Sequence, residues 1–526
     1  MSKKWFMAFA AIVAMTLGGR LSAQQPLADP SYGIGLAPPS LNEPVGNVDQ
    51  RLGNVEQRLE QLELYRLPAI EQTSEQRLTG FLADDDEKED SLADRLKDLE
   101  GKWKKFEDGE KKKKADAAKK PTQKWSGRIH WDYWGFPEES DLANAYETGD
   151  PNNNPNDRFT FRRVRFGVAG DILETMLYKI EMEFANPNDP AFKDVYIGWK
   201  ELPVLQTVLL GNQKRPYGLD HLNSSRYNVF LERPFIIEAV NQDARRFGLC
   251  AYGVSDDERW NWRYGTFLME DIQADGDYTS DDYQMELAGR LANTIWYDET
   301  SDGRGYAHWA VSGTLANPYT TPDGGASNQA RFRTRPEART VQRWYDTSAI
   351  PNADTYQMIG FEGAVNVGPL QVVGEYQHVN VNRNNGANDL QFGGGYVYVA
   401  YFLTGEHTPW ERDTGTLGRV KPFENFFLVN RCRGGVGGGW GAWQIAARYS
   451  YADFTDDTVF GGVGESFTAG VNWWWTPYSR VQFNYITGEI NQGKRATDLG
   501  NPPVTVIPAG GSGHYDIFGA RFMVDF

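Results

Sequence analysis

The chain has 526 residues, of which 24% are charged, and its formal net charge is -17 with a mean hydropathy of -0.58. This acidic balance argues against nucleic acid as a partner and, taken alone, against a protein that attracts anions strongly. Aromatic residues are nevertheless abundant, with 17 Trp, 26 Tyr and 28 Phe. Beyond the N-terminus no apolar run is long enough for a membrane-spanning helix, so membrane insertion would require a closed β-barrel.

The N-terminal segment has the pattern of a cleavable secretory signal. Lys3 and Lys4 precede an apolar run over residues 5–17, and Ala23 follows Leu-Ser. We expect a signal peptide at residues 1–23 and export of the chain. The alternative is a membrane anchor, but the apolar run is shorter than the roughly 20 residues that a spanning helix needs.

Residues 24–47 are rich in Pro, Gly, Ser and Ala without periodicity, which predicts a flexible leader. Residues 48–120 then carry two heptad patterns, which predict two short coiled-coil helices. Their apolar positions are Val48, Leu52, Val55, Leu59 and Leu62, and then Leu92, Leu96, Leu99, Trp103 and Phe106. Single helices of this length are marginal in water, so the seams need each other or equivalent helices in a homo-oligomer. The alternative is an amphipathic helix on the protein's own surface, with Lys111 to Lys114 as a solvated linker.

From residue 124 to residue 526 the apolar pattern has a period of two, which is typical of β-strands. In residues 177–184, for example, Tyr178 and Ile180 point one way while Lys179 and Glu181 point the other. At about 25 residues for a strand with its share of turns, the region holds about sixteen strands. The predicted fold class is therefore an all-β transmembrane barrel of antiparallel strands with an N-terminal α-helical coiled-coil extension. Strands are predicted at residues 128–134, 161–170, 177–184, 195–200, 246–254, 358–365, 371–378, 395–403, 441–451 and 515–526.

The last of these segments shows the alternation most clearly. Phe518, Phe522 and Phe526 share a face that we expect to contact lipid, whereas Arg521 and Asp525 are expected to face water inside the barrel. A soluble β-sandwich is the alternative interpretation of this pattern. Aromatic residues at strand ends are typical of the girdles at both membrane interfaces, and they include Trp131, Tyr133, Trp473, Trp475 and Tyr485.

Several segments in order resemble the outer-membrane porins of the phosphate-selective porin O and porin P type. They include FRRVRFGVAG (161–170), YKIEMEFAN (178–186), KDVYIGW (193–199), GNQKRPYGLDHLNSSRYNVFLERP (211–234), RRFG (245–248), YFLTGEH (401–407), GRVKP (418–422) and GAWQIAARYSYADF (441–454). The resemblance covers residues 124–526. It implies a sixteen-stranded barrel in the outer membrane, usually a homotrimer, with a periplasmic helical extension in some members.

Candidate pore-lining residues are basic side chains that point inward, because charges near a narrow lumen select ions. Alternation places Arg163 and Arg165 in the lumen and Arg162 on the lipid face, unless Arg162 snorkels at the strand end or the strand bends. The resemblance pairs Arg162 with Arg163 as residues that contact a permeating anion, and it implies that the loop after Lys214 folds into the channel. The further candidates are Lys214, Arg215, Arg226, Arg233, Arg245, Arg246, Arg419 and Lys421.

The alternative for each of these residues is a salt bridge within the barrel wall, since Glu181, Glu183, Asp220 and Glu232 lie in the same segments. The chain also lacks the dense lysine ladder of strictly phosphate-selective relatives. Small anions such as phosphate are therefore expected as partners on resemblance, while a general, cation-tolerant porin stays open. Neither a cofactor nor a metal is expected, because no residue cluster has ligand spacing.

The two alternatives to a channel are an enzyme and a structural protein. An enzyme is disfavoured because none of the six histidines lies in a catalytic signature. A structural role is the stronger alternative, in which the coiled coil would tether the outer membrane to the cell wall. The sequence therefore predicts a passive porin with an anion bias. Pairing of Cys250 with Cys432 stays open, as an exported chain permits a disulfide that spacing alone cannot establish.

Overall fold

The computed structural model describes residues 92–118, 121–137, 139–241, 244–272, 284–318, 330–427, 429–430, 435–491 and 511–526. The predicted signal peptide, leader and first heptad run lie outside these residues. The second heptad run lies in helix α3 (Leu92–Ala118), which continues through the lysine block that we interpreted as a linker. None of the described helices has the length and apolar composition needed to cross a membrane.

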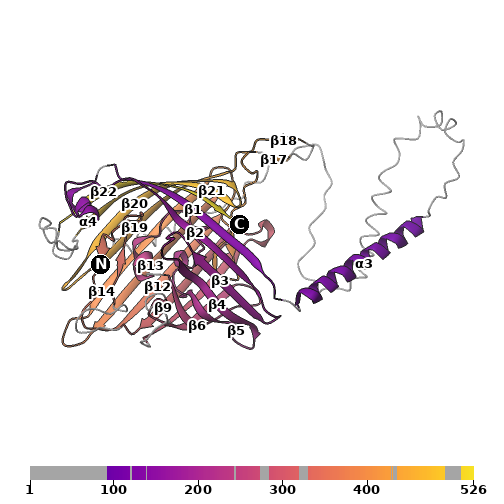
Figure 1. Cartoon of the computed structure of the whole chain (residues 1–526), viewed down its shortest axis with the longest axis horizontal. Coiled ribbons are helices and arrows are strands. Elements are labelled where there is room, and N and C mark those ends of the chain that lie inside the picture. The colour runs from indigo at the N-terminus through magenta and orange to yellow at the C-terminus, as the bar shows by residue number, and fades with distance from the viewer. Residues whose placement is uncertain are drawn as a thin grey trace, which may run out of the picture. The chain divides into compact units, whose positions relative to one another are not determined.

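Sixteen antiparallel strands form a closed barrel, as predicted, and strand β1 pairs with β22 to close it (Figure 1). Every other pairing joins two barrel strands that follow one another along the chain, so the barrel is a simple meander. The strands are β1 (Lys124–Gly135), β2 (Arg158–Asp171), β3 (Met176–Glu183), β4 (Ala191–Leu202), β5 (Gln206–Lys214), β6 (Arg245–Val254), β7 (Trp260–Leu268), β8 (Met285–Tyr297), β9 (Gly305–Ala316), β12 (Ala353–Val367), β13 (Leu370–Arg383), β14 (Leu390–Phe402), β19 (Ala442–Asp456), β20 (Val459–Thr476), β21 (Ser479–Asn491) and β22 (Gly513–Asp525).

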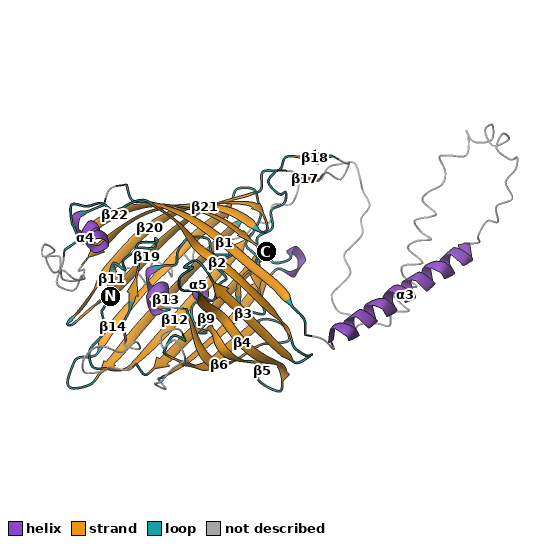
Figure 2. Cartoon of the chain, viewed as in Figure 1, coloured by secondary structure: helices purple, strands orange, loops and turns teal. Residues whose placement is uncertain are grey.

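The connections between the strands carry the shorter elements (Figure 2). We call the end of the barrel at which β1 begins and β22 finishes the terminal end, and the opposite end the distal end. Because neighbouring strands are antiparallel, successive connections lie alternately at the distal end and at the terminal end. The shorter elements are α4 (Asp141–Thr148), α5 (Leu219–Leu222), α6 (Phe235–Val240), the 3₁₀ turn η1 (Glu299–Ser301), β10 (Arg333–Thr334), β11 (Tyr345–Asp346), β15 (Trp410–Glu411), β16 (Thr416–Leu417), β17 (Val429–Asn430) and β18 (Val436–Gly437).

Two distal connections fold into the barrel. The first, described over residues 215–241, carries α5 and α6, and its Leu219 and Asp220 amides both donate to the Glu375 carboxylate on β13 at 2.7 Å. The second joins β9 to β12 through β10 and β11. Its Glu337 accepts hydrogen bonds inside the barrel from Arg448 Nη2 at 2.7 Å and from Ser466 at 2.9 Å.

A third insertion comes from the terminal end and was not predicted. In residues 403–422, between β14 and β19, Trp410 Nε1 donates to Thr294 Oγ1 at 3.1 Å and stacks on Tyr306. The Leu417 amide donates to Asn223 Oδ1 at 2.9 Å, which joins this segment to the first distal insertion. The barrel interior is thus occupied by chain from both ends.

The main apolar core lies within the barrel, where these insertions meet the wall. Phe235 of α6 packs on Tyr345 at a ring distance of 5.0 Å, and Trp344 packs on Tyr515 of β22 at 5.4 Å. The outer wall instead exposes aliphatic and aromatic residues, including Phe518 and Val524 of β22, as expected for contact with lipid.

The expectation that Arg521 and Asp525 face water was wrong in one respect. Both point inward, but Arg521 is 3% exposed and Asp525 is 2% exposed. The infolded connections cover them, and each carries ion pairs: Arg521 with Asp132 at 2.6 Å, and Asp525 with Arg226 at 2.8 Å. A period-two pattern distinguishes inside from outside but does not show whether the inside is filled.

Candidate pore lining

The position of Arg162 depends on a β-bulge. In the β1–β2 pairing His130 faces Arg163 and the next residue, Trp131, faces Phe161, so Arg162 is the extra residue. A bulge adds one residue to a strand and changes the direction of its side chain. The Arg162 guanidinium therefore reaches Glu232 of the first insertion, with Nε–Oε1 at 2.6 Å and Nη2–Oε2 at 2.9 Å.

Strict alternation would place Arg162 on the lipid face, but the bulge turns its side chain into the barrel. The strand bends, which was the second of the two alternatives for this residue. Arg162 and Arg163 consequently belong to the same interior face, although they are adjacent in sequence.

Arg163 is buried and has a different environment from its neighbour. Its Nη1 lies 3.4 Å from His130 Nδ1, and its Nε has no hydrogen-bond partner. It forms no ion pair with a carboxylate in the described part of the chain. Arg163 is therefore a buried cationic side chain without a counter-charge in direct contact.

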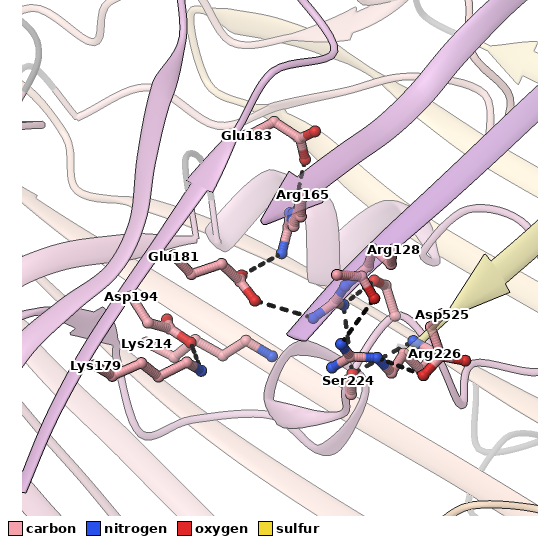
Figure 3. Close-up of polar contacts among 12 residues, drawn as sticks. Arg128, Arg165, Lys179, Glu181, Glu183, Asp194, Lys214, Ser224, Arg226 and Asp525 are labelled. Carbon is pink, nitrogen blue, oxygen red and sulfur yellow. Dashed lines mark hydrogen bonds and ion pairs between the residues drawn. The ribbon is translucent and has the colours of Figure 1, made fainter. Parts of the chain in front are cut away.

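Arg165 belongs to a network of ion pairs along the inner wall (Figure 3). It binds Glu181 through Nη1 at 3.1 Å and Glu183 through Nε at 2.7 Å. Arg128 of β1 binds the other oxygen of Glu181 at 3.1 Å, so one carboxylate on β3 joins three strands. This arrangement is the transverse salt bridge that the sequence left open as the alternative role.

The first insertion uses its predicted basic residues to attach itself. Lys214 Nζ donates to the carbonyl groups of His221, Leu222 and Asn223 at 2.7, 2.8 and 2.9 Å, which satisfies the end of α5. Other basic residues form ion pairs with carboxylates: Arg215 with Glu286 at 2.8 Å, Arg226 with Asp525 at 2.8 Å and Arg233 with Asp220 at 3.1 Å.

The remaining predicted residues divide between wall and connections. Arg245 binds Asp194 at 2.7 Å, and Arg246 Nε donates to the Met269 carbonyl at 2.6 Å. Arg419 binds Asp525 and lies over the Tyr478 ring at 4.5 Å. Lys421 is exposed in the terminal-end connection. Most predicted cations thus have acidic or carbonyl partners in the fold.

Sequence reasoning missed several inward cations. Arg448 on β19 follows the same alternation and could have been found from it. Arg290 on β8 binds Glu362 inside the barrel, beside His308. Arg339 lies in the second insertion, where no periodic pattern exists to indicate its direction.

Arg339 is a half-buried cation among other cations. It forms no hydrogen bond or ion pair within the described residues. The positive charge of Arg162, followed by burial, lowers the pKa of Arg339 to about 10. An arginine remains protonated at such a value at neutral pH. Arg162 interacts electrostatically with both Arg339 and Arg163, and we call these three residues the cationic cluster. The carboxylate in direct contact with the cluster is Glu232, which binds Arg162 and also Arg521.

The neighbouring arginines also determine the protonation state of Glu232. Burial favours its neutral form, but the Arg162 guanidinium, with Arg521 and Arg163, holds the pKa of this carboxyl well below its usual value. Glu232 is thus ionised at neutral pH, and the cluster still has an excess of positive charge.

The sequence of residues 124–526 matches the family model described as phosphate-selective porin O and P, which covers most of the chain. The chain belongs to this family. The family and the closed barrel identify the protein as an outer-membrane porin and point to a channel rather than an enzyme.

Curated relatives of this porin are distant. An uncharacterized protein of Caulobacter vibrioides is 27% identical over 376 residues, which cover 69% of this chain and 68% of the relative. Porin O of Pseudomonas aeruginosa is 27% identical over 143 residues, or 25% of this chain and 30% of Porin O.

Solved structures similar to this porin include the anion-selective porin from Comamonas acidovorans, with 12% identity, a TM-score of 0.44 and coverage of 77% of this chain and 100% of that chain. The outer-membrane protein OmpT of Vibrio cholerae in its trimer form has 11% identity, a TM-score of 0.44 and the same coverage.

Two further expectations about this porin concern its cysteines and metal binding. Cys250 is buried on β6, while Cys432 lies outside the described residues, so their pairing stays open. Among the described residues no group of three His, Cys, Asp or Glu side chains could hold a metal ion.

Proposed function

We propose that this porin conducts small hydrophilic solutes passively and favours anions, phosphate among them, through the cationic cluster of Arg162, Arg163 and Arg339. The observation that carries the proposal is the excess of positive charge in this cluster. Arg163 and Arg339 form no ion pair within the described chain, and Glu232 is shared between Arg162 and Arg521.

The chemistry of the cluster suits oxyanions. A guanidinium presents paired N–H donors that can bind two oxygens of a phosphate at once, and it stays charged when partly dehydrated. Arg165, Arg215, Arg226, Arg233, Arg245 and Arg419 are assigned a supporting role, because their ion pairs fix the wall, the first insertion and the terminal-end insertion.

The proposal is tested by measuring ion selectivity in planar bilayers for the wild-type porin and the Arg339→Gln variant. We expect chloride preference in the wild type, block by inorganic phosphate, and a weaker preference in the variant. Arg259→Gln is the matched control, since Arg259 lies exposed in a terminal-end turn. Equal selectivity in Arg339→Gln and wild type would contradict a role for the cluster.

We propose a homotrimer with the N-terminal extension in the periplasm, and here the helix α3 supports an assembly role. Its Trp103 and Phe106 are 69% and 62% exposed, and a seam of this kind needs an apolar partner. Deletion of residues 24–120 distinguishes the roles: loss of trimers on native electrophoresis indicates assembly, whereas intact trimers with weaker cell-wall retention indicate a tether.

A further inference from the structure

A second part of the β14–β19 connection lies outside the barrel. After the inserted segment, residues 423–427 and 435–441 form what we call the rim segment, which is held together in part by the pairing of β17 with β18. Figure 1 draws β17 and β18 outside the outline of the barrel, at the end where the C-terminus lies. The connection therefore contributes both to the lumen and to the outer surface.

The rim segment is fixed to the outward side of β19 and β20. Trp443 and Trp473 point outward, and both indole N–H groups donate to the Trp440 carbonyl, at 3.1 and 2.8 Å. Phe426 packs on Trp473 at a ring distance of 4.6 Å and on Trp475 at 5.5 Å. Its amide donates to the Trp475 carbonyl at 2.7 Å. These contacts make the rim segment continuous with the lipid-facing wall.

Large apolar side chains of the rim segment remain uncovered by the rest of the described chain. Trp440 is 79% exposed and Phe427 is 63% exposed, and Phe423 and Val436 are exposed to a similar degree. Exposed apolar surface of this kind indicates contact with a membrane or another protein. Arg304 lies over the Phe423 ring at 6.0 Å, which puts a cation beside the aromatic group.

We propose that the rim segment is a membrane-binding surface that lies in the interfacial layer of the bilayer, with Trp440 and Phe427 inserted among lipid headgroups and upper acyl chains. Continuity with the outward residues Trp443, Trp473 and Trp475 selects lipid as the partner, because Trp and aromatic side chains are stable at this depth. The surface extends the girdle of the barrel beyond its strands.

The test uses a fluorophore whose depth can be measured in vesicles. In a Cys250→Ala, Cys432→Ser background, single cysteines at Trp440, Phe427, Phe467 or Thr458 are labelled with a nitrobenzoxadiazole group, and the full chain is reconstituted in phosphatidylcholine vesicles. Phe467 on the outward side of β20 provides a hydrocarbon control, and Thr458 in the exposed distal turn provides an aqueous control.

We expect labels at Trp440 and Phe427 to be quenched at least threefold more by nitroxides at the headgroup or at acyl carbon 5 than by aqueous iodide. The Phe467 label should respond most to a nitroxide at carbon 12. If both rim labels behave like the Thr458 label, the proposal is wrong. It is equally wrong if lipid nitroxides have no effect and mixing with unlabelled chain changes the signal, since the partner is then a second copy. The labels at Trp440 and Phe427 are in separate variants, so if one variant does not fold, the other still gives the result.

Discussion

Glu232 is the carboxylate that limits the positive charge of the cluster, so its neutralisation is the most informative perturbation. Its side chain binds Arg162 at 2.6 and 2.9 Å and Arg521 at 2.9 Å. Glu232→Gln keeps the shape and one acceptor oxygen while removing a negative charge. We expect stronger anion selectivity, because Arg162 and Arg521 then have one fewer counter-charge.

The size of the effect follows from Coulomb's law. A unit charge acts on an ion passing about 8 Å away with about 0.5 kcal/mol at the dielectric constant of water. Anions gain this amount and cations lose it, so the selectivity ratio rises about fivefold in dilute salt. Near 0.1 M salt, where the Debye length is about 10 Å, about a twofold rise remains.

The assay is the reversal potential across a tenfold KCl gradient, for which the limit of perfect selectivity is about 59 mV. Glu232→Gln should move the potential by about 10–20 mV toward the chloride limit. Glu465→Gln is the matched control, because Glu465 lies exposed on the outward side of β20. An unchanged potential, or a shift toward potassium, in a folded Glu232→Gln barrel would refute the reasoning.

Three further predictions concern stability. Arg521→Ala leaves Asp132 buried without its partner and should lower the free energy of unfolding by about 3–5 kcal/mol in urea titration, whereas an effect below about 1 kcal/mol would contradict the pairing. Gly441→Ala places a Cβ 2.1 Å from the Trp474 carbonyl at a φ of 68°, so refolding yield measured by heat modifiability should fall, and a normal yield would contradict the strain. Burial raises the pKa of Glu139 to about 8, so its protonated form stabilises the folded state and this stability is lost as pH rises from about 4.5 to about 8. Protease cleavage within residues 136–157 should increase across that range, and Glu139→Gln should remove the dependence; a wild-type rate that is flat with pH would contradict it.

The strands were predictable because lipid outside and chain inside impose a period of two on every one of them. The same period correctly separates Ile180 from Glu181 on β3, and it extends to Arg448, which was overlooked. The bulge at Arg162 could not be read from the sequence, since a single extra residue changes the phase without a composition signal. Its presence decides which residues can share the cluster.

The sequence pattern also did not predict that connections between strands fill the barrel interior, and this is the larger difference. Ion pairs such as Arg215 with Glu286 and Arg448 with Glu337 join residues that are distant in the chain, and residue type alone does not select partners. The insertion of residues 403–422 likewise depends on contacts such as Trp410 with Thr294. Irregular segments carry no repeating pattern, so their direction follows from tertiary contacts.

The central claim is that the cationic cluster gives this porin a preference for anions despite an acidic chain. The most direct measurement is the sign of the zero-current potential of wild-type channels in a planar bilayer across a KCl gradient, followed by addition of inorganic phosphate. The account predicts a chloride-selective potential and a concentration-dependent fall in chloride conductance when phosphate is added. A potassium-selective potential without block by phosphate would contradict it.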